Sequence, residues 1–106
     1  MKTEIYKNGP ISCGIDAGDE FRVYAGGIFS QHKKDPEINH IISLLGWGMD
    51  ALTGEEYWIG RNSWGTYWGE MGFFRIKMYT DNLAVETECN AAIPSFTKAS
   101  QNEEII

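Results

Sequence analysis

Apolar and polar positions along the chain follow the pattern of a small domain built mainly from strands. Residues 8–15 (NGPISCGI) combine a turn signal with a short apolar run, which predicts a strand. Residues 40–49 (HIISLLGWGM) are continuously apolar, so we expect a buried strand whose glycines mark a bend or a bulge. Residues 73–79 (FFRIKMY) alternate between apolar and polar, which is typical of a further long strand.

A turn at 50–56 (DALTGEE) joins the long apolar run to a second strand-like run at 57–63 (YWIGRNS). Two such runs separated by a short turn predict an antiparallel hairpin. Because the hairpin centres near residue 51, it is expected to bring His40 close to Asn62.

One helix is expected among the strands. Phe21 and Tyr24 recur at helical spacing, and a Gly-Gly pair just beyond them supplies a stop signal. We therefore predict a helix over residues 18–25. The stretch at 30–39 is polar and contains a proline, so it is expected to be a surface loop.

These elements predict an α+β fold that is rich in β-structure, with an antiparallel sheet or half-barrel and one short helix. Residues 1–89 are expected to form this domain. Residues 90–106 lose periodicity and become polar, which predicts a loose tail. The strands carry more apolar surface than one helix can cover, so the sheet is expected to need a second partner.

Composition excludes several classes of function. The net charge of −6 argues against nucleic acid, which needs a basic face. No apolar run approaches the roughly 18 residues of a membrane span, so no membrane association is expected. The first ten residues lack the apolar region of a signal peptide and resemble an interior segment behind an initiator methionine, which indicates a fragment of a larger protein.

Two cysteines, Cys13 and Cys89, lie near opposite ends of the predicted domain. Either they pair, which would imply an oxidising compartment, or they are two buried thiols. A zinc site made from Cys13, His32, His40 and Cys89 has the right residue types but the wrong spacing, because structural sites place their ligands in close pairs. Neither a metal nor any other cofactor is expected, and His32 reads as a solvated loop residue.

His40 and Asn62 are the candidates for chemistry. An asparagine can accept a hydrogen bond from one imidazole nitrogen and leave the other nitrogen free for reaction. Trp64 could then lie over the pair and keep water away from that bond. The alternatives are a structural histidine and tryptophans that only fill the core.

Three segments together resemble the papain-like cysteine peptidases. They are GPISCGI…YAGGIF, INHIISLLGWG and YWIGRNSWGTYWGEMGFFRIK, and the resemblance spans about residues 5–89. The RNSWG-x-x-WGE-x-G pattern is specific, because the histidine segment precedes it at the spacing of the family. Within the family, the motifs are most similar to a member that acts as a carboxypeptidase.

The resemblance implies a role for each candidate. His40 would hold a catalytic cysteine as thiolate and later protonate the leaving amine. Asn62 would orient His40, and Trp64 would shield their hydrogen bond. The substrate-binding residues would be Trp68, on the side beyond the scissile bond, and Ile41 and Gly14, near the pocket for the second residue before it.

The resemblance also implies a peptide or protein substrate, a disulfide between Cys13 and Cys89, and a lysosomal or extracellular location. The bulk of Ile41 argues against a deep pocket beside it.

The chain departs from the family pattern at the nucleophile. The family places its reactive cysteine in a CWAFS-like segment at the head of a long helix, and this sequence has no such segment. Cys13 lies inside an apolar run and is not expected to replace it. We therefore expect half of a catalytic site, lacking the N-terminal domain as partner and inactive by itself. A non-catalytic binding module, a pseudoenzyme and a fragment without function are the alternatives.

Overall fold

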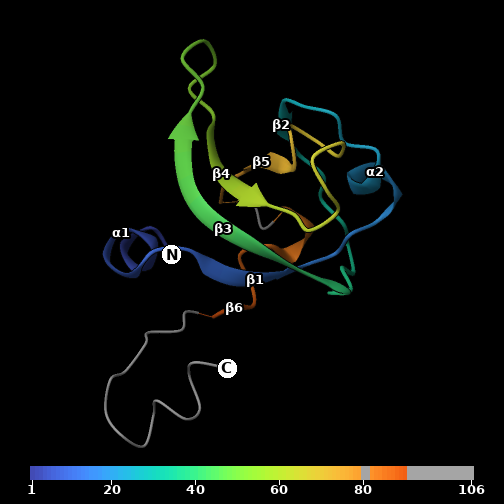
Figure 1. Ribbon diagram of the computed structural model, residues 1–106, viewed down its shortest axis with the longest axis horizontal. Coiled ribbons are helices and arrows are strands. Elements are labelled where there is room, and N and C mark those ends of the chain that lie inside the picture. Colours follow the sequence, from blue (N-terminus) through green and yellow to red (C-terminus); the bar gives the residue numbers. More distant parts are fainter. Residues whose placement is uncertain (80–81, 91–106) are drawn as a thin grey trace, which may run out of the picture.

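The computed structural model of the chain describes residues 1–79 and 82–90. Its elements in chain order are α1 (Lys2–Asn8), β1 (Ile11–Ile15), α2 (Asp19–Arg22), β2 (Ile28–Phe29), β3 (His40–Met49), β4 (Glu56–Arg61), β5 (Phe73–Lys77), the 3₁₀ turn η1 (Asn82–Ala84) and β6 (Cys89–Asn90). Figure 1 shows β3 and β4 as a long, curved hairpin, with β1 crossing below it. Of the tail predicted at 90–106, Asn90 belongs to β6, and residues 91–106 lie outside the described residues.

The six strands form one sheet in the order β2-β5-β4-β3-β1-β6. The β-rich α+β fold expected from the sequence is confirmed. The sheet is not wholly antiparallel, however, because β2 pairs with β5 in parallel at one edge. A two-residue strand carries too little pattern for its direction to be predicted from sequence.

The β3–β4 hairpin has the irregularity that its glycines predicted. Leu44 lies opposite Gly60 and Gly46 lies opposite Ile59, so Leu45 is the extra residue of a β-bulge. The bulge lets Leu44 face the core, where it is fully buried, while Leu45 is exposed. The tip of the hairpin projects beyond the rest of the fold (Figure 1).

The helical predictions need two corrections. The helix expected at 18–25 ends at Arg22, although Phe21 and Tyr24 are both buried as their spacing suggested. Beyond the helix, the Tyr24 hydroxyl donates to the Gly27 carbonyl oxygen at 2.5 Å. A second helix, α1, was not predicted, since Ile5 is its only buried residue and a single apolar position sets no helical pattern.

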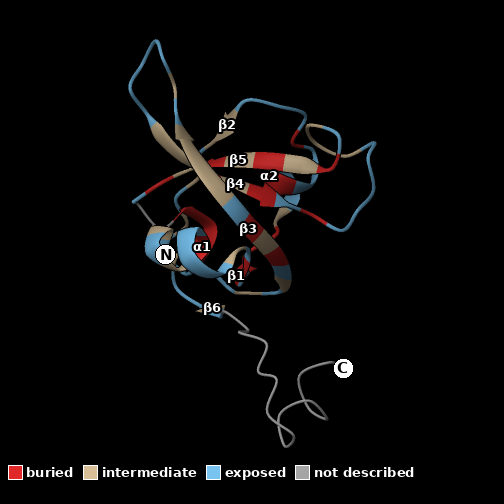
Figure 2. Ribbon diagram, turned by 60° about the vertical axis from the view of Figure 1, so that its left-hand side comes forward, coloured by how far each residue is buried: buried red, intermediate tan, exposed pale blue. Residues whose placement is uncertain are grey.

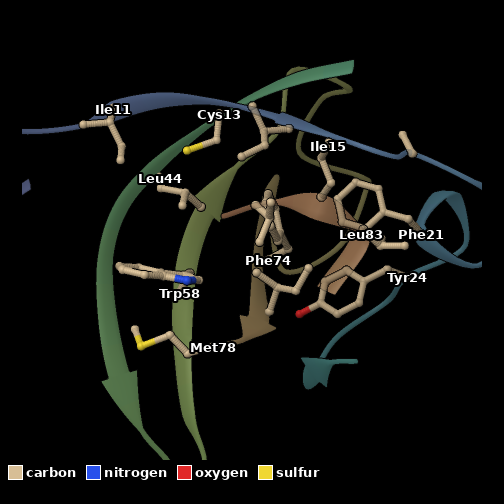
Figure 3. Packing of buried hydrophobic residues seen from close by; sticks show 14 of the residues in the cluster. Ile11, Cys13, Ile15, Phe21, Tyr24, Leu44, Trp58, Phe74, Met78 and Leu83 are labelled. Atoms are coloured by element: carbon tan, nitrogen blue, oxygen red, sulfur yellow. The ribbon is translucent and has the colours of Figure 1, made fainter. Parts of the chain in front are cut away.

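The core lies inside the curve of the sheet and is closed by α2 and the segment around η1. Figure 2 shows buried residues in β4 and β5, and exposed residues along α1 and the tip of the hairpin. Phe21 is the buried residue of α2. In Figure 3, side chains from β1, β3, β4 and β5 meet those of the α2 segment; among the fully buried ones are Cys13, Ile15, Phe21, Leu44 and Phe74.

Cys13 of β1 and Cys89 of β6 lie opposite each other in register and form a disulfide, with 4.1 Å between their Cα atoms. The bond spans 76 positions of the sequence. It ties the edge strand β6, at the end of the described chain, to the neighbouring strand β1, where Cys13 is fully buried.

Reduction of this disulfide is expected to destabilise the fold by roughly 4 kcal/mol, because it frees a long loop in the unfolded chain. Urea unfolding with and without reductant measures the difference. Two alkylatable thiols in the unfolded, non-reduced protein would show that the bridge is absent in solution.

Gly60 of β4 and Gly46 of β3 make a matched pair of test sites. A Cβ atom at Gly60 would overlap the buried ring of Phe74, whereas one at Gly46 would come no nearer than 3.8 Å to Ile59. We expect Gly60→Ala to lower the free energy of unfolding by about 1–3 kcal/mol through overpacking. Gly46→Ala should cost clearly less in the same urea titration, and equal costs would contradict the packing described.

Candidate active site

His40 is the first residue of β3 and lies opposite Ile15 of β1. Asn62 directly follows β4, and its backbone N–H donates to the Gly72 carbonyl oxygen at 2.9 Å. The two side chains meet: His40 Nε2 lies 2.7 Å from Asn62 Oδ1. The hairpin therefore brings together the two residues that the sequence singled out.

The register differs from the symmetric one expected. Ser43 lies opposite Arg61, so continuing the ladder places Ile42, not His40, opposite Asn62. His40 and Asn62 consequently meet diagonally across the hairpin, at a separation that long side chains can bridge.

The orientation of the Asn62 amide fixes the tautomer of His40. Asn62 Oδ1 also accepts a hydrogen bond from the Ser63 backbone N–H at 2.8 Å, and a backbone N–H can only donate. The atom that faces His40 is therefore the oxygen, which carries no proton. His40 Nε2 must donate to it, and in the neutral ring Nδ1 is left as an unprotonated base.

Asn62 is buried, and its Nδ2 has no hydrogen-bond partner among the described residues. An unpartnered buried donor is unfavourable by about 1–3 kcal/mol. The amide nevertheless keeps this orientation, because turning it over would set Nδ2 against the Ser63 N–H and lose the bond to His40. Asn62 is thus held for its acceptor oxygen.

Trp64 covers the pair from one side. Its ring stacks on the His40 imidazole with 4.9 Å between centroids and 24° between planes. An indole over a hydrogen bond excludes water and lowers the local dielectric, which strengthens the bond. The outer part of the ring is open to solvent, and 38% of Trp64 is exposed.

A cluster of aromatic rings holds Trp64 in place. Phe21 and Trp68 contact it edge-on, with centroids 5.9 Å and 5.3 Å away. The Trp68 indole N–H donates to the Arg22 carbonyl oxygen at 3.0 Å, which fixes the second tryptophan to the end of α2. Both indoles are only partly buried, so they build a wall beside His40 and are not interior core residues.

Each of these tryptophans precedes a glycine that turns the loop. Gly65 and Gly69 have φ angles of 94° and 60°, which side-chain-bearing residues adopt with strain. At Gly69 a Cβ atom would also lie 2.6 Å from the Phe73 carbonyl oxygen. The repeated Trp-Gly spacing thus lets the loop fold back and set both rings side by side.

Two hollows border the site. One of about 420 Å³ is lined by Arg22 and Trp64. The other, of about 430 Å³, lies on the outer face of the sheet and is lined by Ser12, Ile41, Ile42, Ser43, Arg61, Asn62 and Ser63. The second hollow reaches Asn62, and the first reaches the Trp64 ring that stacks on His40.

Gly14 and Ile41 lie opposite each other in the β1–β3 ladder, next to His40. A Cβ atom on Gly14 would come within 2.6 Å of the Ile38 side chain, so Ile38 already covers Gly14. Ile41 is 62% exposed. Ile38 thus fills the space beside Gly14, and the lack of a deep pocket expected from the bulk of Ile41 stays a prediction.

The cysteines contribute no nucleophile. Both cysteines of the sequence are joined in the disulfide, so neither is available as a thiolate. The same bond removes two of the four ligands of the zinc site weighed above, and His32 is exposed. Within residues 1–79 and 82–90, no group of three metal-binding side chains comes together.

Residue-by-residue reading of the sequence missed the Ser63 backbone N–H and Phe21 as supports of the site. Neither carries a signal of its own, because a backbone donor has no side-chain signature and Phe21 reads as a core residue. The nearest signal was the position of Ser63 directly after Asn62.

Comparison with known proteins gives consistent matches. The family described as papain family cysteine protease matches residues 1–94. Cathepsin Z of Onchocerca volvulus is 52% identical over 101 residues, covering 89% of this chain and 33% of that protein. Cathepsin C of Schistosoma mansoni is 38% identical over 96 residues, covering 82% of this chain and 21% of that protein. The chain thus spans a third or less of these relatives.

Solved structures match at the level of the fold and of the sequence. Digestive procathepsin L 3 of Tenebrio molitor has a TM-score of 0.74 and 36% identity, over 81% of this chain and 28% of that one. Bromelain from Ananas comosus, in complex with the E64 inhibitor, has a TM-score of 0.70 and 33% identity, over 80% of this chain and 38% of that one.

Removal of the Trp64 ring is expected to expose the His40 Nε2 proton to water. In Trp64→Ala, this proton should exchange with solvent about tenfold faster. A tenfold change corresponds to the net free energy of about one hydrogen bond, which here would be weakened by contact with water. NMR of ¹⁵N-histidine-labelled protein measures the exchange. Tyr67→Ala is the control, since Tyr67 is fully exposed in the same loop; equal effects of the two variants would contradict the shielding.

Proposed function

Because the chain belongs to the papain family of cysteine proteases, we propose that it supplies the histidine and asparagine of a peptidase site whose nucleophile comes from another part of the complete enzyme. The observation that carries the proposal is the 2.7 Å contact between His40 Nε2 and Asn62 Oδ1 under the Trp64 ring. The disulfide between both cysteines, and the third of cathepsin Z that the chain spans, support the outside source of the thiol.

The chemistry follows from the tautomer. His40 Nδ1 takes the proton of the incoming thiol, and the resulting thiolate attacks the carbonyl carbon of the scissile peptide bond. The imidazolium then returns its proton to the leaving amine, which departs as the acyl-enzyme forms. Water, with its proton taken by Nδ1, then attacks the thioester carbonyl carbon; the C–S bond breaks, the carboxylic acid is released, and the sulfur leaves as a thiolate beside the imidazolium. Asn62 accepts from Nε2–H throughout and keeps Nδ1 facing the reaction.

The substrate in this proposal is a peptide or protein. The hollow lined by Arg22 and Trp64 accommodates residues beyond the scissile bond, since Trp64 stacks on the His40 imidazole and Trp68 packs edge-on against Trp64. Ile41, Gly14 and the overlying Ile38 border the residues before that bond. We further propose that the cleavage is carboxypeptidase-like, as the sequence resemblance implies.

We place the protein in the lysosome or outside the cell, since a stable disulfide belongs to an oxidising compartment. No helix among the described residues has the length and apolar character needed to cross a membrane.

The second candidate is a non-catalytic, peptidase-like module that binds a partner. It is favoured by the same disulfide, which leaves the 106-residue sequence without a thiolate. The two candidates differ in whether the chain supports cleavage once a nucleophile is provided.

A chimera in which this chain replaces its matching segment of Onchocerca volvulus cathepsin Z provides that nucleophile. We expect the chimera to hydrolyse peptides and to react with E64. His40→Ala should lower kcat/KM by about 10³-fold or more, because the thiol loses its base. Asn62→Ala should cause a smaller loss, since the imidazole remains.

The control is Tyr67→Ala, which should keep full activity. A folded chimera that neither cleaves peptides nor reacts with E64 would refute the peptidase function and favour the binding module.

A further inference from the structure

Asp16 is a buried carboxylate next to the site that the chemistry above does not use. It directly follows β1 and is the one buried acidic residue among those the structure describes, with 5% exposed. Its Oδ1 lies 3.0 Å from the Lys33 ammonium, and its Oδ2 accepts the Glu37 backbone N–H at 2.9 Å. Burial opposes ionisation, but these two partners outweigh it and hold the pKa of Asp16 below its ordinary value.

The partners of Asp16 lie in the loop that leads directly into His40. Lys33 and Glu37 belong to the 30–39 segment, which lacks regular secondary structure from residue 30 onward. A segment of this kind is fixed only by the bonds that it makes with its surroundings, because each ordered residue costs about 1–2 kcal/mol of backbone entropy. The ion pair and the Glu37 bond fasten it at two points to a single carboxylate.

Asn39 extends the attachment to the residue before the histidine. Its backbone N–H donates to the Ile15 carbonyl oxygen at 3.2 Å, and its side-chain oxygen accepts the Ala17 N–H at 2.9 Å. Residues 37 and 39 are thus both bonded to the 15–17 segment, on either side of Ile38, which packs over Gly14. His40 begins its strand immediately after these contacts.

We propose that Asp16 is a positioning residue for His40: it clamps the 33–39 segment to the end of β1 and so fixes the backbone from which the imidazole projects. Asn62 and Trp64 contact the imidazole ring of His40 directly. Asp16 acts on the backbone of His40, through the 33–39 segment that precedes it. This role rests on the proposed peptidase function, because it matters only if Nδ1 must meet a thiol. A displacement of about 1 Å can cost on the order of 10²-fold in rate when reacting groups are preorganised.

The test follows the His40 Nε2 proton in this chain by NMR, which requires no cleavage. In Asp16→Ala, we expect the exchange of that proton to accelerate by about tenfold or more, the scale of one lost charge-assisted hydrogen bond. Its chemical shift should move as well, while core methyl signals such as those of Leu44 and Ile76 stay in place. Asp16→Asn should give a smaller change, because an amide oxygen still accepts the Glu37 N–H but loses the attraction to Lys33.

The matched control is Glu56→Gln. It removes a surface ion pair with Lys2, at 2.8 Å, that has no contact with the 33–39 segment. The two variants are compared under conditions where both are folded. If Asp16 only stabilises the fold, the exchange rate and chemical shift of the His40 proton in Asp16→Ala will match those in Glu56→Gln. That result would overturn the proposal. If Asp16→Ala does not fold, Asp16→Asn decides by the same comparison.

The chimera adds a kinetic measurement. Asp16→Ala should lower kcat more than it raises KM, because the residue positions the base and lies away from both hollows. A loss confined to KM would overturn the proposal. An inactive wild-type chimera would instead tell against the peptidase function, and the NMR comparison would still decide whether Asp16 positions His40.

Discussion

The hydrogen bond between His40 and Asn62 is the interaction on which the rest of the site depends. It joins the first residue of β3 to the residue after β4, so it exists only because the hairpin is closed in one register. The bulge at Leu45 helps to set that register, and a slip of one residue would turn Asn62 to the other face of the sheet. The fold and the proposed chemistry of this chain therefore depend on the same strand pairing.

Neighbouring groups contact both partners of this bond. Trp64 stacks on the imidazole, and the Phe21 and Trp68 rings pack edge-on against Trp64. The backbone of Ser63 decides which way the Asn62 amide faces. Asn62 Nδ2 is buried without a hydrogen-bond partner among the described residues, and in this orientation the amide presents its oxygen to His40.

The sequence predicted the hairpin, its bulge and the meeting of His40 with Asn62, because these follow from a long apolar run, two glycines and a short turn. It did not predict α1, where Ile5 alone faces the core, or the parallel β2–β5 pair, which consists of two residues on one side. The sequence did not predict the contacts of Asp16 either, for another reason. Its partners, Lys33 and Glu37, are 17 and 21 positions away, and no local pattern reveals such contacts.

The protonation of the His40 ring is the most direct measure of this account. Long-range ¹H–¹⁵N correlation in ¹⁵N-histidine-labelled protein distinguishes the two nitrogens of a neutral imidazole. The structure predicts a protonated Nε2, bonded to Asn62, and an unprotonated Nδ1. A ring that carries its proton on Nδ1 would show that Asn62 does not accept from His40 and would contradict the proposed site.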